Sequence, residues 1–110
     1  MIPYLSDVTD VLNGIGIDWY NTLPDGENEP EPPFIGFFAT EDKNDYADGQ
    51  VWIPLMSYDI ALATRRRDYD LEKKVEVALD EKGIPWKKSV SEVTDQALIE
   101  VDYSIDLIED

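Results

Sequence analysis

The fold of this chain is decided by residues 58 to 88, YDIALATRRRDYDLEKKVEVALDEKGIPWKK. The first six residues alternate between large apolar side chains and small or acidic ones, which is the two-residue period of a half-buried strand. Apolar residues then recur with the spacing of one helical face, at Leu71, Val75, Ala78 and Leu79. Asp68 or Asp70 can cap the start of this helix, and Gly83 followed by Pro85 ends it. The stretch predicts one helix laid across an antiparallel sheet.

The preceding residues predict a first helix and two more strands. Residues 3–13 carry a helical apolar stripe that two glycines stop. Residues 18–23 predict a short aromatic strand, and residues 34–40, FIGFFAT, predict a central strand because both faces are apolar. Between them, residues 24–33, PDGENEPEPP, predict an exposed acidic loop, which is either a connector or a binding segment in polyproline geometry.

Residues 41–50, EDKNDYADGQ, have turn chemistry throughout, and Asp48-Gly49 is a good hairpin tip. Acids at alternate positions raise the question of a calcium loop. The spaced ligand series of an EF-hand is missing, so we expect no metal here. Pro54 predicts that the following strand bends or enters from a sheet edge.

The last strand has the clearest alternation in the chain, over ALIEVDYSIDLI at residues 97–108. One face carries Ile99, Val101, Tyr103, Ile105 and Leu107, and is predicted to be core. The other face carries Glu100, Asp102 and Asp106. Such an acidic stripe is either the solvated side of an antiparallel sheet or a surface turned towards a partner or a channel.

Length and composition indicate one folded domain over residues 1–110. The hydrophobic fraction is 43%, which exceeds that of disordered chains, and no apolar run reaches the ~20 residues that span a bilayer. The first ten residues lack the features of a secretory signal, and the absence of cysteine favours synthesis in the cytosol.

The side-chain inventory argues against an enzyme. Histidine and cysteine are both absent, which removes the most common general base, the usual nucleophilic triads and the His- or Cys-based zinc sites. We therefore predict no catalytic residues, no cofactor and no metal.

The net charge is −16, from 25 acidic and 9 basic residues. This field repels nucleic acid and anionic membranes. It fits a soluble self-repelling surface, a face for a basic partner, a DNA mimic, or a wall that DNA passes without adsorbing. The sequence does not decide among these four interpretations of the negative charge.

Arg65, Arg66 and Arg67 form the one concentration of positive charge in the sequence, at the junction between the strand and the helix. Two interpretations stand beside each other. The arginines pair locally with nearby acids, or they anchor a neighbouring subunit, because arginine binds carboxylates in a bidentate fashion. In the second case an acidic stripe elsewhere on the molecule allows head-to-tail association.

Residues 33 to 107 resemble the tail terminator proteins of long-tailed phages and prophages of Gram-positive bacteria, also called tail-completion or tail-to-head joining proteins. The resemblance is carried by PPFIGFF (32–38), NDYADGQVW (44–52), residues 58–88 and the closing alternation at 97–108. It covers about three quarters of the chain.

The resemblance implies an α/β fold of the α+β type, with a mixed, mostly antiparallel sheet flanked by two helices. It also implies a structural virion protein at the head-tail junction, synthesised in the host cytoplasm. Such proteins cap the tail tube as a hexameric ring, end its polymerisation and form the surface for head joining. The implied partners are other copies of the chain, the major tail tube protein and a head-completion or connector protein, with DNA passing through the ring unbound.

Within this interpretation we expect two contact regions. Arg65, Arg66 and Arg67 would anchor the adjacent subunit or the tube, and the loop formed by Tyr46, Ala47, Asp48 and Gly49 would reorganise on docking. Glu100, Asp102 and Asp106 would line the channel or face a partner. The alternatives are an acidic inhibitor, as a DNA mimic or immunity-type protein, and a head-completion or connector adaptor.

Overall fold

The computed structural model describes residues 2–22, 30–47, 51–93 and 97–109, with the backbone alone for residues 41–47 and 51–54. In chain order the elements are α1 (Leu5–Ile15), β1 (Trp19–Tyr20), β2 (Phe34–Ala47), β3 (Val51–Thr64), α2 (Tyr69–Glu81), β4 (Lys87–Val93) and β5 (Leu98–Ile108). Residues 24–29 of the predicted loop 24–33 lie outside the described residues, as do Asp48 and Gly49.

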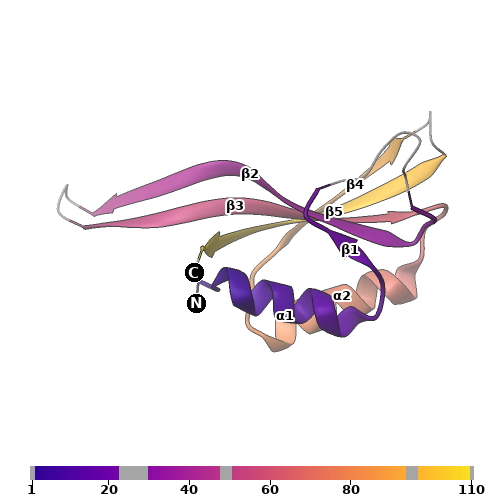
Figure 1. Cartoon of the computed structure of the whole chain (residues 1–110), viewed down its shortest axis with the longest axis horizontal. Helices are drawn as coiled ribbons and strands as arrows, with labels where there is room; N and C mark the ends of the chain where they lie inside the picture. Colours follow the sequence, from indigo (N-terminus) through magenta and orange to yellow (C-terminus); the bar gives the residue numbers. More distant parts are fainter. Residues whose placement is uncertain (1, 23–29, 48–50, 94–96, 110) are drawn as a thin grey trace.

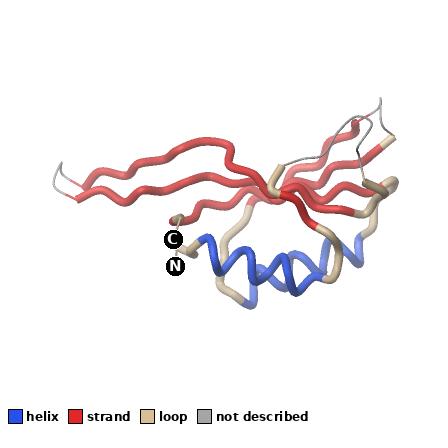
Figure 2. The backbone as a smooth tube through the Cα atoms, viewed as in Figure 1, coloured by secondary structure: helices blue, strands red, loops and turns tan. Residues whose placement is uncertain are grey.

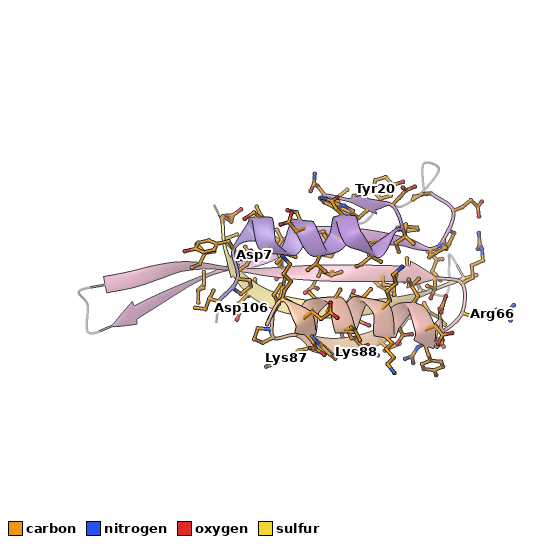
Figure 3. All side chains as sticks on the ribbon, turned by 90° about the horizontal axis from the view of Figure 1, so that it is seen from below. Asp7, Tyr20, Arg66, Lys87, Lys88 and Asp106 are labelled. Atoms are coloured by element: carbon orange, nitrogen blue, oxygen red, sulfur yellow. The ribbon has the colours of Figure 1, made fainter. Side chains whose placement is uncertain are left out.

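The strands form one sheet in the order β1-β2-β3-β5-β4, with α1 and α2 side by side on one face (Figures 1 and 3). Every neighbouring pair is antiparallel except β1 with β2, which is parallel. The two chain ends meet where the Ile108 amide donates to the Pro3 carbonyl at 2.9 Å. The predicted mixed, mostly antiparallel sheet with two flanking helices is confirmed.

The core lies between the sheet and the helices. Its fully buried members come from both helices and three strands: Val8, Leu12, Ile35, Ile60, Leu62, Val75, Leu79, Val101, Tyr103 and Leu107. Ile60 and Leu62 confirm the predicted core face of β3, but this strand is not half-buried, because Ala61 and Ala63 on its other face are buried as well. The reason is topological, since β3 lies between β2 and β5 in the interior of the sheet.

Local sequence explains where the helices begin and end. The Asp68 carboxylate accepts the Leu71 amide at 3.1 Å, and Gly83 takes a positive φ of 71° just past the end of α2. The first helix was predicted over residues 3–13 but spans 5–15, because the chain at Pro3 pairs with β5 and Gly16, with φ 97°, supplies the stop.

The hairpin of β2 and β3 runs beyond the rest of the sheet (Figures 1 and 2). The prediction of turn structure throughout residues 41–50 is wrong for 41–47, which pair in register with β3 as far as Ala47 opposite Val51. Pairing across the hairpin has overridden local turn preference. The pairing of β5 with β3 stops at Leu55, so no residue of β5 lies opposite Pro54. Pro54 therefore occupies an edge position with respect to β5, which is where a sheet tolerates proline.

We call residues 44–47 of β2 and 51–54 of β3 the ribbon. These residues pair only with each other in the described part of the chain, and neither helix extends beneath them (Figure 1). No helix in the described part of the chain is long and apolar enough to cross a bilayer.

Two valines on α2 test this packing. Val75 is fully buried and Val77 is 41% exposed. We expect Val75→Ala to lower the free energy of unfolding by about 2 kcal/mol, through lost burial and a residual cavity. Val77→Ala should change it by less than ~0.5 kcal/mol. Urea denaturation of both variants measures the difference, and equal losses would contradict the assignment of the core face.

Candidate functional site

The arginine turn between β3 and α2 contains a buried ion pair. Arg67 donates from Nε to Glu72 Oε2 at 2.9 Å and from Nη2 to Glu72 Oε1 at 2.8 Å. Glu72 is only 2% exposed, and Lys88 of β4 approaches the same carboxylate at 2.9 Å. The hydrogen bonds from Arg67 hold the pKa of Glu72 below its ordinary value, against the opposing effect of burial. Arg67 therefore has a structural role, which is to hold the turn to α2.

The ion pair is part of a polar network between α2 and the sheet. Lys88 Nζ lies 2.7 Å from Glu76 Oε2, and the Tyr103 hydroxyl donates to the same oxygen at 2.8 Å. The network thus joins α2 to β4 and β5. Glu72 is a buried structural carboxylate that we did not predict from the sequence. Its spacing from Val75 and Leu79 places it on the core face of the helix, and this was the signal for a buried carboxylate.

The other two arginines are differently placed. Arg65 forms a 3.2 Å pair with Glu31, but their side chains are 59% and 90% exposed, so the pair contributes little stability. Arg66 is exposed and forms no hydrogen bond or ion pair with any residue that the structure describes. Figure 3 shows it projecting from the end of the molecule opposite the ribbon. Local pairing thus applies to Arg67 and weakly to Arg65, whereas Arg66 is available for contact.

The turn lines a shallow depression of about 690 Å³. Pro32 and Pro33, the last two residues of the predicted acidic loop 24–33, form one side, and residues 64–70 form the other. Arg66 lies in the wall of this depression.

The predicted acidic stripe lies on the face of the sheet that the helices leave uncovered. Val101, Tyr103, Ile105 and Leu107 are all buried towards the helices, so the intervening Glu100, Asp102 and Asp106 face the other way. The alternation predicted for β5 is confirmed.

Neighbouring strands add to this stripe. The Ser57 hydroxyl of β3 donates to Asp106 at 2.7 Å, and the Ser104 hydroxyl donates to Asp59 of β3 at 2.9 Å. Asp59 is a fourth acid that we had not predicted here, because its place beside β5 depends on long-range strand register. We call Asp59, Glu100, Asp102 and Asp106 the acidic face.

Asp102 occupies an electrostatically unfavourable position within the acidic face. Its Oδ1 atom is enclosed and has no hydrogen-bond partner among the described residues. Burial first, then the hydrogen bond to Glu100 and the nearby charges of Glu100 and Asp59, raise the pKa of Asp102 to about 7. The strand register places Lys87 of β4 opposite Ser104, and no cation is among the charges that shift the pKa of Asp102. The acidic face is consequently short of cations within the described chain.

The second predicted contact region is at the far end of the molecule from Arg66. Tyr46 and Ala47 are the last residues of β2, so they belong to a strand and not to a loop, while Asp48 and Gly49 lie outside the described residues. The two predicted contact regions are therefore separated along an axis that extends 48 Å. Both lie at ends of the molecule, and the acidic face lies between them.

Comparison with known proteins adds no assignment. No family model matches the sequence, and a search among curated proteins finds no match. In the described part of the chain no three acidic, histidine or cysteine side chains are grouped to hold a metal ion.

The ion pair predicts unequal roles for adjacent arginines. Arg67→Met should lower the thermal midpoint at pH 7 by about 5 °C, because Glu72 would remain buried with one cation fewer. Arg66→Met, the matched control, should leave the midpoint unchanged. The folded-state pKa of Glu72 lies below the unfolded value of ~4.3, so this stabilisation is present above that value and disappears as the pH falls through the folded pKa. Scanning calorimetry at pH 7 and pH 3 measures both effects.

Asp102 predicts a dependence of stability on pH with the opposite sign. Its folded-state pKa of about 7 exceeds the unfolded value of ~3.9, so the folded protein loses stability as the pH rises through that window. Asp102→Asn should stabilise the protein by about 1–2 kcal/mol at pH 8.5, a value reduced because solvent screens part of the repulsion, and by little at about pH 3, below the unfolded pKa of ~3.9. Asp10→Asn on the exposed side of α1 is the control. Urea denaturation at the two pH values would contradict the assignment if the gain did not depend on pH.

Proposed function

We propose that this chain is a structural virion protein that caps a phage tail tube as a ring. In this role it ends tail polymerisation and forms the surface for head joining. The observation that carries the proposal is the separation of two dissimilar contact regions, Arg66 at one end and the ribbon at the other (Figure 3). Dissimilar surfaces join copies head to tail, and head-to-tail contacts produce a ring wherever the rotation closes.

The resemblance to tail terminator proteins supports the same role and suggests six copies. Its fold expectation, a mixed sheet with two flanking helices, agrees with the observed arrangement. The proposed partners are further copies, the major tail tube protein and a head-completion or connector protein. The proposed location is the head-tail junction of the virion, after synthesis in the host cytoplasm.

The acidic face suggests how DNA would pass such a ring. We place Glu100, Asp102 and Asp106, together with Asp59, on the wall of the channel. Carboxylates there repel phosphates, so DNA slides through without adsorbing. This role requires no catalytic residue and no cofactor, in keeping with the absence of histidine and cysteine from the sequence.

One observation favours a second candidate function, an acidic inhibitor that mimics DNA. Four carboxylates gather on one uncovered sheet face, which is closer to the surface of a mimic than the scattered acids suggested by the sequence. Such an inhibitor would remain a monomer and bind a basic nuclease. A connector adaptor, the third possibility, would assemble on the head and leave tail tubes uncapped.

Capping can be measured directly. We expect the purified chain, added to growing tubes of the tail tube protein from the same phage, to shorten the tubes and leave a ring at one end. Electron microscopy gives the length distribution, with an unrelated protein of similar size and charge as the control. Tubes of unchanged length with bare ends would refute the proposed function, and a tight complex with a basic nuclease would favour the inhibitor.

A further inference from the structure

The ribbon has no partner of its own in the described part of the chain. Residues 44–47 and 51–54 pair across the hairpin, while β5 ends its pairing at Leu55 and the helices do not reach them (Figures 1 and 2). A two-stranded ribbon is marginally stable in water and exposes unpaired backbone groups along both edges. A contact from outside would therefore be stabilising.

The outer half of β2, residues 41–47, which leads into the ribbon, is acidic in sequence. Glu41, Asp42 and Asp45 lie in the outer half of β2, against a single Lys43. At the base of the ribbon, Asp106 and Glu109 lie at the end of β5, and Figure 3 shows Asp106 on that side of the molecule. This end therefore offers a neighbour an excess of negative charge in a narrow projection.

The opposite end has a depression lined by the three arginines and also by Asp68, which caps α2, and by Asp70. Arg67 is held by Glu72 and Arg65 pairs only weakly with Glu31, so Arg66 is the arginine of the turn without a partner among the described residues. The depression beside it is open, and its lining includes the backbone that enters α2. A guanidinium binds carboxylates in a planar, bidentate manner that fixes orientation as well as affinity.

We propose that these two ends are the two halves of one interface: the outer half of β2 (residues 41–47), together with the ribbon that it enters, docks in one copy on the Arg66 turn of the next copy. The occupant of the depression is thus a second copy of this chain. An intramolecular contact is impossible because the ends lie apart along the 48 Å axis (Figure 3). The inference rests on the proposed function, since it supplies the contact that would build the ring.

The dimensions agree with overlapping copies. The outer part of β2, residues 41–47, spans about 23 Å at ~3.3 Å per residue. If this length lies against the neighbour, each copy advances the assembly by roughly half of its own 48 Å axis. The net charge of −16 opposes the approach of two copies, so a local cation at the contact is needed to select one orientation.

A charge exchange between the two ends tests the interface. One variant carries Arg66→Glu, and a second carries Glu41→Lys, Asp42→Lys and Asp45→Lys. The matched control is Lys73→Glu, which makes the same charge change at an exposed lysine of α2. Masses are measured by size-exclusion chromatography with light scattering at ~0.15 M salt, where charges more than ~8 Å apart are largely screened. Thermal midpoints show that each variant is folded.

We expect the wild type and the Lys73→Glu control to assemble to the same mass. Each charge-exchange variant alone should associate at least tenfold more weakly, because like charges then face each other at the interface. An equimolar mixture of the two should recover association. In that mixture the glutamate introduced by Arg66→Glu meets an outer half of β2 that is basic, and the unchanged Arg66 of the other variant meets one that is acidic.

Three outcomes would overturn the inference. The first is an Arg66→Glu variant that assembles like the wild type, and the second is a mixture of folded variants that stays monomeric. The third is a wild type that does not self-associate. The first two leave the ring intact and affect only the interface, whereas loss of tube capping by the wild type would remove the proposed function itself.

Discussion

The buried carboxylate of Glu72 is the constraint on which the arrangement around α2 depends. A carboxylate that is 2% exposed is stable only with cations at hydrogen-bond distance, and Arg67 and Lys88 supply them from the turn and from β4. Because Lys88 also binds Glu76, and Tyr103 donates to Glu76, one helix is fixed to two strands by polar contacts. The turn before α2 has its conformation set by this network and not by the core alone.

That constraint divides the arginine turn into a structural part and an exposed part. Arg67 binds Glu72 of α2 and therefore has a structural role. Replacing all three arginines together would change both the stability of the fold and any assembly. Arg66 is held at the tip of a turn that its neighbour fixes. A turn whose backbone is already fixed loses less conformational entropy when one of its side chains binds a partner, and this suits a contact residue.

The sheet face that the helices leave uncovered also has carboxylates with hydrogen-bond partners and one carboxylate in an unfavourable position. Its acids are spaced by the two-residue period of β5, and serines from the same sheet bind two of them. No cation compensates Asp102 within the described chain, so the fold tolerates repulsion at this position.

The sequence by itself determined the local features: the stripe of α2, its Asp68 cap and Gly83 stop, and the alternation of β5, because each depends on residues a few positions apart. It also placed the charge of the arginine turn at a junction between strand and helix. Only the tertiary structure decided the continuation of β2 to Ala47, since pairing with β3 overrode local turn preference. The tertiary structure likewise decided that Arg67 is paired while Arg66 is exposed, and that Asp59 belongs to the acidic face. Both results depend on side chains that the fold brings together, which local sequence spacing does not encode.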